Sequence, residues 1–194
     1  MERGIMKTQN WKWKISEAIE RIRSRYHHIG RKTGAPFLAI IYPPEIETAV
    51  LKEWHDQAAG LAPDFEVRSM DALEVTHQVL SEIGAENIVS SLRDPMPGSD
   101  PEAELGNIWI STIADTIRAR LDEPGAGKPV VSLEKLAALY PACGPRDVMQ
   151  QLWSNAESTI EGPVVVLIPG YIEGARTYSF LGLKSEFMYR GDLL

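Results

Sequence analysis

The sequence has almost no cysteine, no long apolar segment and no excess of basic charge. Cys143 is the only cysteine among 194 residues, so neither an internal disulfide nor a cysteine-rich zinc site can form. No apolar run approaches the roughly 18–20 residues that span a bilayer, and the polar N-terminus does not have the pattern of a signal peptide. We therefore expect a soluble, cytoplasmic protein without a membrane partner.

The charge balance limits the classes of partner. Twenty basic residues stand against 27 acidic ones, which gives a formal net charge of −7. A general nucleic-acid binder needs a basic footprint, so this balance argues against one, although a local basic patch is still allowed. An apolar content of 44% is ordinary for a globular chain, and the length fits one domain.

Short apolar segments alternate with longer amphipathic ones along the chain. Helices are predicted over residues 11–29, 45–59, 72–83, 102–121 and 146–156, and strands over 35–42, 65–68, 163–168 and 186–190. Periodicity leaves open whether the segment from residue 129 is a strand or a helical turn. This alternation predicts an open three-layer α/β sandwich with a mostly parallel sheet of about five strands and an N-terminal amphipathic helix. We expect residues 1–33 to form a helical appendage and residues 34–194 to form a single α/β domain.

A search for catalytic and cofactor motifs finds none. The turn after the first strand has no glycine or lysine to cradle a phosphate, and Gly125–Lys128 precedes a strand where a phosphate loop would follow one. The histidines form no metal-binding pair at helical spacing, and Cys143 has no adjacent base. We therefore assign no catalytic residue, no metal ligand and no cofactor, and expect a protein that is not an enzyme.

The first predicted helix has a basic side. Its candidate docking residues are Lys12, Lys14, Arg21 and Arg25. Such a helix could dock onto nucleic acid or onto an acidic protein surface. The alternative is that the helix packs through its apolar stripe and leaves its polar face in solvent.

The C-terminal third carries a resemblance. Tyr140-Pro141, Pro169-Gly170, Leu181-Gly182-Leu183 and Tyr189-Arg190 occur in that order, around a helix and an apolar strand. This succession resembles the BrxB family of bacteriophage exclusion (BREX) defence systems, whose members carry Y-P, Y-P-G, G-x-L and Y-Y-R segments in the same order. The order of the earlier elements, a helix and then a strand that opens with Pro36-Phe37, also fits that family.

The resemblance implies a cytoplasmic, non-enzymatic assembly factor of an anti-phage system. Its expected partners are the phosphatase-like protein PglZ and other BREX components, with an association with DNA only through them. No family catalytic residues can be carried over. Aromatic residues and prolines at strand ends are candidates for a rigid contact surface, and their alternative is ordinary turn chemistry and packing. These candidates are Tyr42, Pro43, Tyr140, Pro141, Pro169, Gly170 and Tyr171.

Two other functions stay open. The first is a degenerate nucleotide-binding, P-loop-like domain that keeps a weak ligand or a DNA contact; the alternating layout favours it and the missing phosphate loop opposes it. The second is an enzyme whose site carries no recognisable motif.

Overall fold

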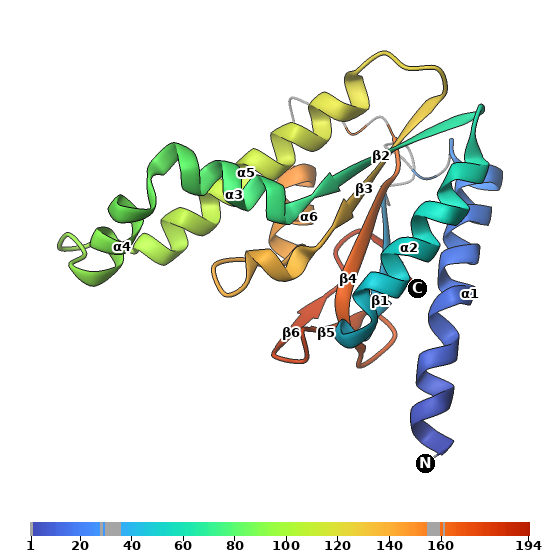
Figure 1. The fold of residues 1–194 in the computed structure, drawn as a ribbon, viewed down its shortest axis with the longest axis horizontal. Coiled ribbons are helices and arrows are strands. Elements are labelled where there is room, and N and C mark those ends of the chain that lie inside the picture. The colour runs from blue at the N-terminus through green and yellow to red at the C-terminus, as the bar shows by residue number, and fades with distance from the viewer. Residues whose placement is uncertain (1, 28, 30–35, 155–159, 161) are drawn as a thin grey trace.

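Six α-helices and seven strands make up the chain in the computed structural model, which describes residues 2–27, 29, 36–154, 160 and 162–194 (Figure 1). The helices are α1 (Glu2–Arg25), α2 (Glu47–Ala58), α3 (Ala72–Ile83), α4 (Ala85–Arg93), α5 (Pro101–Asp122) and α6 (Pro145–Ser154). The strands are β1 (Phe37–Tyr42), β2 (Phe65–Asp71), β3 (Lys128–Glu134), β4 (Val164–Ile172), β5 (Thr177–Phe180), β6 (Lys184–Phe187) and β7 (Gly191–Leu193).

The sheet confirms the predicted α/β class. Its main path runs β2-β3-β4-β1-β7, and every neighbouring pair on that path is parallel. The strands β5 and β6 extend it beyond the end of β4 through antiparallel pairs. The sheet is therefore mostly parallel, as expected, and has seven strands where the sequence indicates about five.

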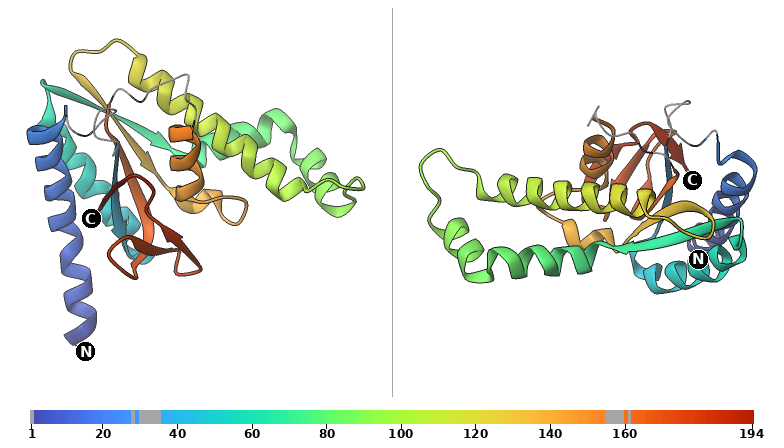
Figure 2. Two further views of the ribbon diagram at one scale, coloured as in Figure 1. Left: turned by 180° about the vertical axis from the view of Figure 1, so that it is seen from behind. Right: turned by 90° about the horizontal axis from the view of Figure 1, so that it is seen from above.

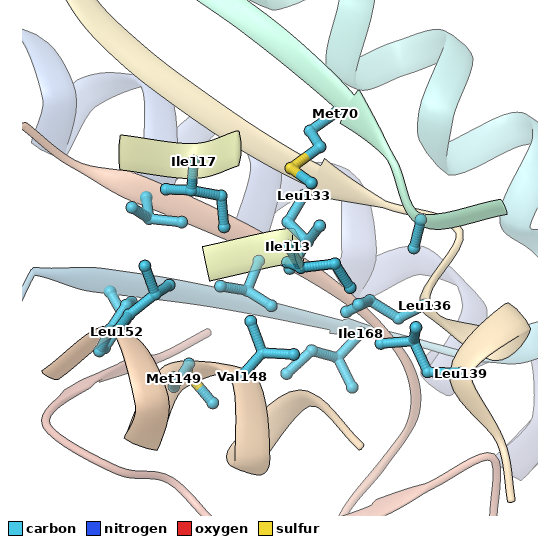
Figure 3. Close-up of a cluster of buried hydrophobic side chains, with 14 of the residues drawn as sticks. Met70, Ile113, Ile117, Leu133, Leu136, Leu139, Val148, Met149, Leu152 and Ile168 are labelled. Atoms are coloured by element: carbon cyan, nitrogen blue, oxygen red, sulfur yellow. The ribbon is translucent and has the colours of Figure 1, made fainter. Parts of the chain in front are cut away.

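Helices cover both faces of this sheet, as an open three-layer sandwich requires. Successive side chains of a strand point to opposite faces. Leu38 and Ile40 of β1 accordingly pack with α1 and α2. Ala39 and Ile41 pack with α3, α5 and α6 in a second core cluster, part of which is shown in Figure 3. Each residue of β1 is buried, which explains its continuous apolar sequence.

The N-terminal helix packs on the sheet. Ile15, Ala18 and Ile22 are fully buried in the cluster that α1 shares with α2, β1 and β4. The helix begins at Glu2, well before the predicted start at residue 11, because no helix-breaking segment separates residues 2–10 from the apolar stripe. The expected boundary between appendage and domain, at residues 33 and 34, lies outside the described residues.

Several local signals are confirmed. The predicted helix over residues 72–83 corresponds to α3, which Asp71 caps by accepting a hydrogen bond at 2.8 Å from the backbone N–H of Leu73. The predicted helix over residues 102–121 corresponds closely to α5. The segment from residue 129, which periodicity left open, forms both structures in turn. The strand β3 comes first, and a 3-10 turn over Leu136–Leu139 follows it.

Two predicted strands differ from the structure, and one helix was not predicted. β4 does not end before Pro169-Gly170 but continues to Ile172, because Pro169 pairs with the last residue of β1 and the strand then pairs with β5. The predicted last strand over residues 186–190 is replaced by β6 and β7. The helix α4 has no counterpart in the sequence prediction, since none of its residues is buried and it has no core stripe to detect.

Candidate functional site

Polar side chains gather where β2 and β3 approach their carboxyl ends, the edge at which open α/β sheets usually bind ligands. Ser132 and Glu134 lie two residues apart on β3 and therefore share a face, and Ser69 of β2 pairs with Ser132 in the register. The Ser132 hydroxyl donates to Glu134 Oε1 at 2.7 Å, and His55 Nε2 of α2 lies 3.0 Å from both Glu134 oxygens. We call these four residues the carboxyl-edge cluster.

Burial determines the chemistry of this cluster. Glu134 is 4% exposed, and a buried carboxylate is stable only when it is hydrogen-bonded or paired. Ser132 and His55 supply those bonds. Nearby, burial raises the pKa of the Tyr42 phenol far above its usual range, with smaller contributions from Glu47 and Glu134. The phenol therefore stays protonated and donates to Glu47 at 2.7 Å.

The cluster does not have the geometry of a serine relay. In such a relay one ring nitrogen of the histidine accepts from the serine while the other donates to the carboxylate. Here Ser69 Oγ lies 3.5 Å from the same Nε2 that faces Glu134. A nitrogen that donates to the carboxylate cannot also accept the serine proton, so this arrangement joins α2 to the sheet without activating Ser69.

Sequence reasoning missed Ser69, Ser132 and Glu134, and it assigned no role to His55. A signal was available in β3, where a serine and a glutamate on one face interrupt an apolar strand. A pocket of about 380 Å³ lies beside His55 and Ser69, walled largely by small and apolar side chains. Within the described part of the chain, no group of three or more His, Cys, Asp or Glu residues could hold a metal ion.

The proposed contact surface at the strand ends needs correction. Tyr42, Pro169 and Gly170 are buried, because β1 is covered on both faces and β4 continues past its proline. These three residues therefore contribute packing and cannot form a contact surface.

The remaining members of the predicted surface are accessible. Tyr140, Pro141 and Tyr171 are exposed and Pro43 is half-buried. Tyr171 is partly engaged already, because its hydroxyl donates to Glu45 at 3.2 Å, while the ring of Tyr140 packs edge-on against Phe180. Tyr171 and Tyr140 therefore each contact the body of the protein, through different partners.

Most of the basic side of α1 is engaged within the chain. Lys12 lies 3.3 Å from a carboxylate oxygen of Glu53, and Arg21 pairs with Glu17 and Asp192. Lys14 Nζ donates to the backbone carbonyl of Ile41 at 2.9 Å. Of the four candidates, Arg25 is exposed and its side chain forms no ion pair with another described residue. The geometry thus favours packing of α1 on the body, the alternative given for this helix.

Lys14 is expected to make the free energy of unfolding depend on pH in the alkaline range. Burial lowers the pKa of its ammonium to about 8, whereas an unfolded lysine titrates at about 10.4. Between these values the unfolded chain binds more protons, so the free energy of unfolding should rise as pH increases from about 8 toward 10. Solvent screening of this part-exposed group limits the rise to about 1 kcal/mol. Urea denaturation at pH 7.5 and 9.5 should show the rise in the natural protein and in Lys12→Met. If the rise persisted in Lys14→Met, Lys14 would not be the group that causes it.

The glycine-containing turn before β3 is unsuited to a phosphate. The backbone N–H of Ala126 donates to the Glu66 carboxylate at 3.1 Å, so an anion of the protein already occupies the position a phosphate would need. The turn also lies at the amino end of β3, away from the edge where open sheets bind nucleotides. This geometry opposes nucleotide binding at Gly125–Lys128.

A second buried polar cluster surrounds Glu186 of β6, whose side chain is 1% exposed. The carboxylate accepts from the Tyr178 hydroxyl at 2.8 Å and from the backbone N–H of Arg146 at 3.1 Å, and Lys184 Nζ lies 3.1 Å from its other oxygen. It thus joins β5 and β6 to the start of α6. Burial also raises the pKa of the nearby Cys143 thiol to about 12, which leaves it protonated and weakly nucleophilic at neutral pH.

The helices α3, α4 and α5 form an arm that extends away from the sheet, with α4 at its far end (Figures 1 and 2). We define this helical arm as residues 72–110. Large apolar side chains are exposed on its outer part: Val89 is 44% exposed, Leu92 50%, Met96 76% and Ile108 43%. Ile108 lies next to the buried Trp109 on α5, yet it turns away from the core and is exposed.

A small apolar groove lies between α4 and α5 on this arm. It has a volume of about 130 Å³, and its lining includes Ile83, Ile88, Leu92, Glu104, Leu105 and Ile108. Two of these residues, Leu92 and Ile108, also belong to the exposed large apolar side chains of the described residues. Leu92 and Ile108 therefore join the groove to the exposed apolar surface of the arm.

No helix among the described residues has the length and apolar character needed to cross a membrane. Comparison with known proteins gives no assignment for the chain, since no family model, no curated protein and no solved structure matches it.

Proposed function

We propose that the chain is a protein-binding assembly component of a BREX anti-phage system, that it is not an enzyme, and that the phosphatase-like protein PglZ is its direct partner. The resemblance of the C-terminal third supplies the system and the partner. The observation that supports a binding role is the exposure of Val89, Leu92, Met96 and Ile108 on one projecting arm.

Exposed apolar side chains gathered in one region are typical of a surface that another protein covers. On the arm they lie on α4, on the loop after it and on α5, and none of the residues of α4 is buried. A helix of that kind contributes little to the stability of the sandwich, since most helical stability comes from packing an apolar face. Partner binding explains its apolar side chains better than folding does.

Co-purification tests this function. We expect a tagged chain, expressed with the rest of its operon, to retain PglZ at micromolar concentration. Leu92→Ser together with Ile108→Ser should abolish retention, or reduce it at least about 10-fold, since central apolar contacts carry about 2 kcal/mol or more each. Leu183→Ser is a matched control, because Leu183 is equally apolar and 68% exposed but lies on the turn between β5 and β6.

The control variant should retain the partner as the natural chain does. Clean separation of the natural chain from PglZ would contradict the proposed function. Equal retention by the arm variant and the control would place the contact elsewhere on the protein and remove the role of the arm.

A further inference from the structure

The helical arm is one of the two strongly acidic parts of the chain. Residues 72–110 contain seven carboxylates and one basic residue, Arg93, so the arm carries −6 of the total formal charge of −7. The carboxylates are Glu74, Glu82, Glu86, Asp94, Asp100, Glu102 and Glu104. The rest of the chain has 20 acidic and 19 basic residues, because the basic excess of residues 1–33 offsets a second acidic segment, residues 34–71.

These carboxylates have little counter-charge within the protein. Across the described residues, none of the ion pairs includes a carboxylate of the arm. Asp100 caps α5 by accepting from the N–H of Ala103, and Glu82 accepts from Gln78. The other carboxylates are exposed to solvent, and Glu104 lies in the wall of the apolar groove.

We infer that the arm binds a basic amphipathic helix of a partner protein, an inference that rests on the proposed function and names the chemistry of the partner segment. The groove between α4 and α5 accepts apolar side chains that recur every three or four residues, the pattern of helix-in-groove recognition. The exposed carboxylates of the arm, with Glu104 in the groove wall, select lysine and arginine on the flanks of that helix and repel an acidic segment. The surface therefore discriminates by charge sign as well as by apolar contact.

Peptide binding to the full-length chain tests this inference. Three fluorescent 18-residue peptides serve as probes: one with leucine at helical spacing and lysine elsewhere, one with the same leucines and glutamate elsewhere, and a scrambled leucine–lysine peptide without an apolar face. We expect fluorescence anisotropy to show that the first binds at least about 10-fold more tightly than the others. Its affinity should fall severalfold between 50 and 300 mM salt, because exposed charges are screened.

Charge reversal on the arm provides the second test. Glu86→Lys with Glu104→Lys should weaken binding of the first peptide at least about 10-fold. The matched control, Glu20→Lys with Asp122→Lys, changes the net charge equally at exposed positions off the arm and should bind like the natural chain. Circular dichroism melts of both variants check that each is folded.

Other results would overturn the inference. Equal binding of the lysine and glutamate peptides would show that charge sign does not select the partner. Concentration-dependent self-association that involves the arm and resists the first peptide would make a second copy the occupant. If PglZ is retained by the charge-reversed arm but lost from the Leu92→Ser and Ile108→Ser variant, the proposed function stands and the basic-helix inference fails.

Discussion

Replacing Glu186 by alanine is expected to lower the free energy of unfolding by about 2–4 kcal/mol, the range for removing one partner from a buried polar network. The carboxylate accepts hydrogen bonds from the Tyr178 hydroxyl and from the first turn of α6, and it forms an ion pair with Lys184. Its removal leaves the fully buried Tyr178 hydroxyl without its acceptor and takes a negative charge from the start of a helix. Lys184 is about half exposed and can be solvated, so most of the loss comes from the other two contacts.

Urea denaturation of a small set of variants measures this effect. Tyr178→Phe should lower stability by about 1 kcal/mol, since it removes one hydrogen bond without leaving the phenol unpaired. The double variant Glu186→Ala/Tyr178→Phe should lose less than the sum of the two single losses, because the orphaned hydroxyl is gone. A loss below about 0.5 kcal/mol for Glu186→Ala would refute a structural role for this cluster.

A methyl group at Gly170 is expected to destabilise the protein by about 2–4 kcal/mol, near the upper range for overpacking a core. Gly170 pairs with Phe180 across β4 and β5. A Cβ built there collides with the backbone carbonyl oxygen of Ser179 and lies 3.1 Å from its carbonyl carbon. Those atoms belong to the paired strand and cannot swing aside, so Gly170→Ala must separate β4 from β5.

Gly174→Ala is the matched control for this substitution. Its Cβ would lie 2.6 Å from Thr177 Oγ1, the end of a flexible side chain that can rotate away. Its stability should stay within about 0.5 kcal/mol of the natural protein, as for most substitutions outside packed sites. Equal melting temperatures for the two glycine variants would show that the close approach of β4 and β5 is not required.

The parts of the fold that the sequence predicts are those with local signals. The burial of β1 on both faces produces a continuous apolar run, and the cap at Asp71 needs only a neighbouring N–H. The end of β4 was mispredicted because a proline usually interrupts pairing, whereas here Pro169 lies where the strand changes partner from β1 to β5. That exchange is set by residues distant in the sequence.

In the candidate sites, too, the sequence predicts what has a local signal and misses what depends on distant residues. The acidic charge of residues 72–110 can be counted in the sequence, but helical periodicity alone could not show that Ile108 faces solvent. The carboxyl-edge cluster depends on register and on the packing of α2, which bring His55 to Glu134 across 79 positions of the chain. Tyr42 was predicted at the surface because a strand end is often exposed, yet the packing of α2 buries it.

Amide hydrogen exchange on the purified complex tests the central claim, that the helical arm is the partner-binding surface. Exchange is measured for the chain alone and for the chain mixed with PglZ, its proposed partner. The account predicts slower exchange within residues 85–108 on binding, and unchanged exchange along β2 and beside the pocket at His55. Slower exchange confined to β2 or to α1, with the arm unaffected, would contradict it.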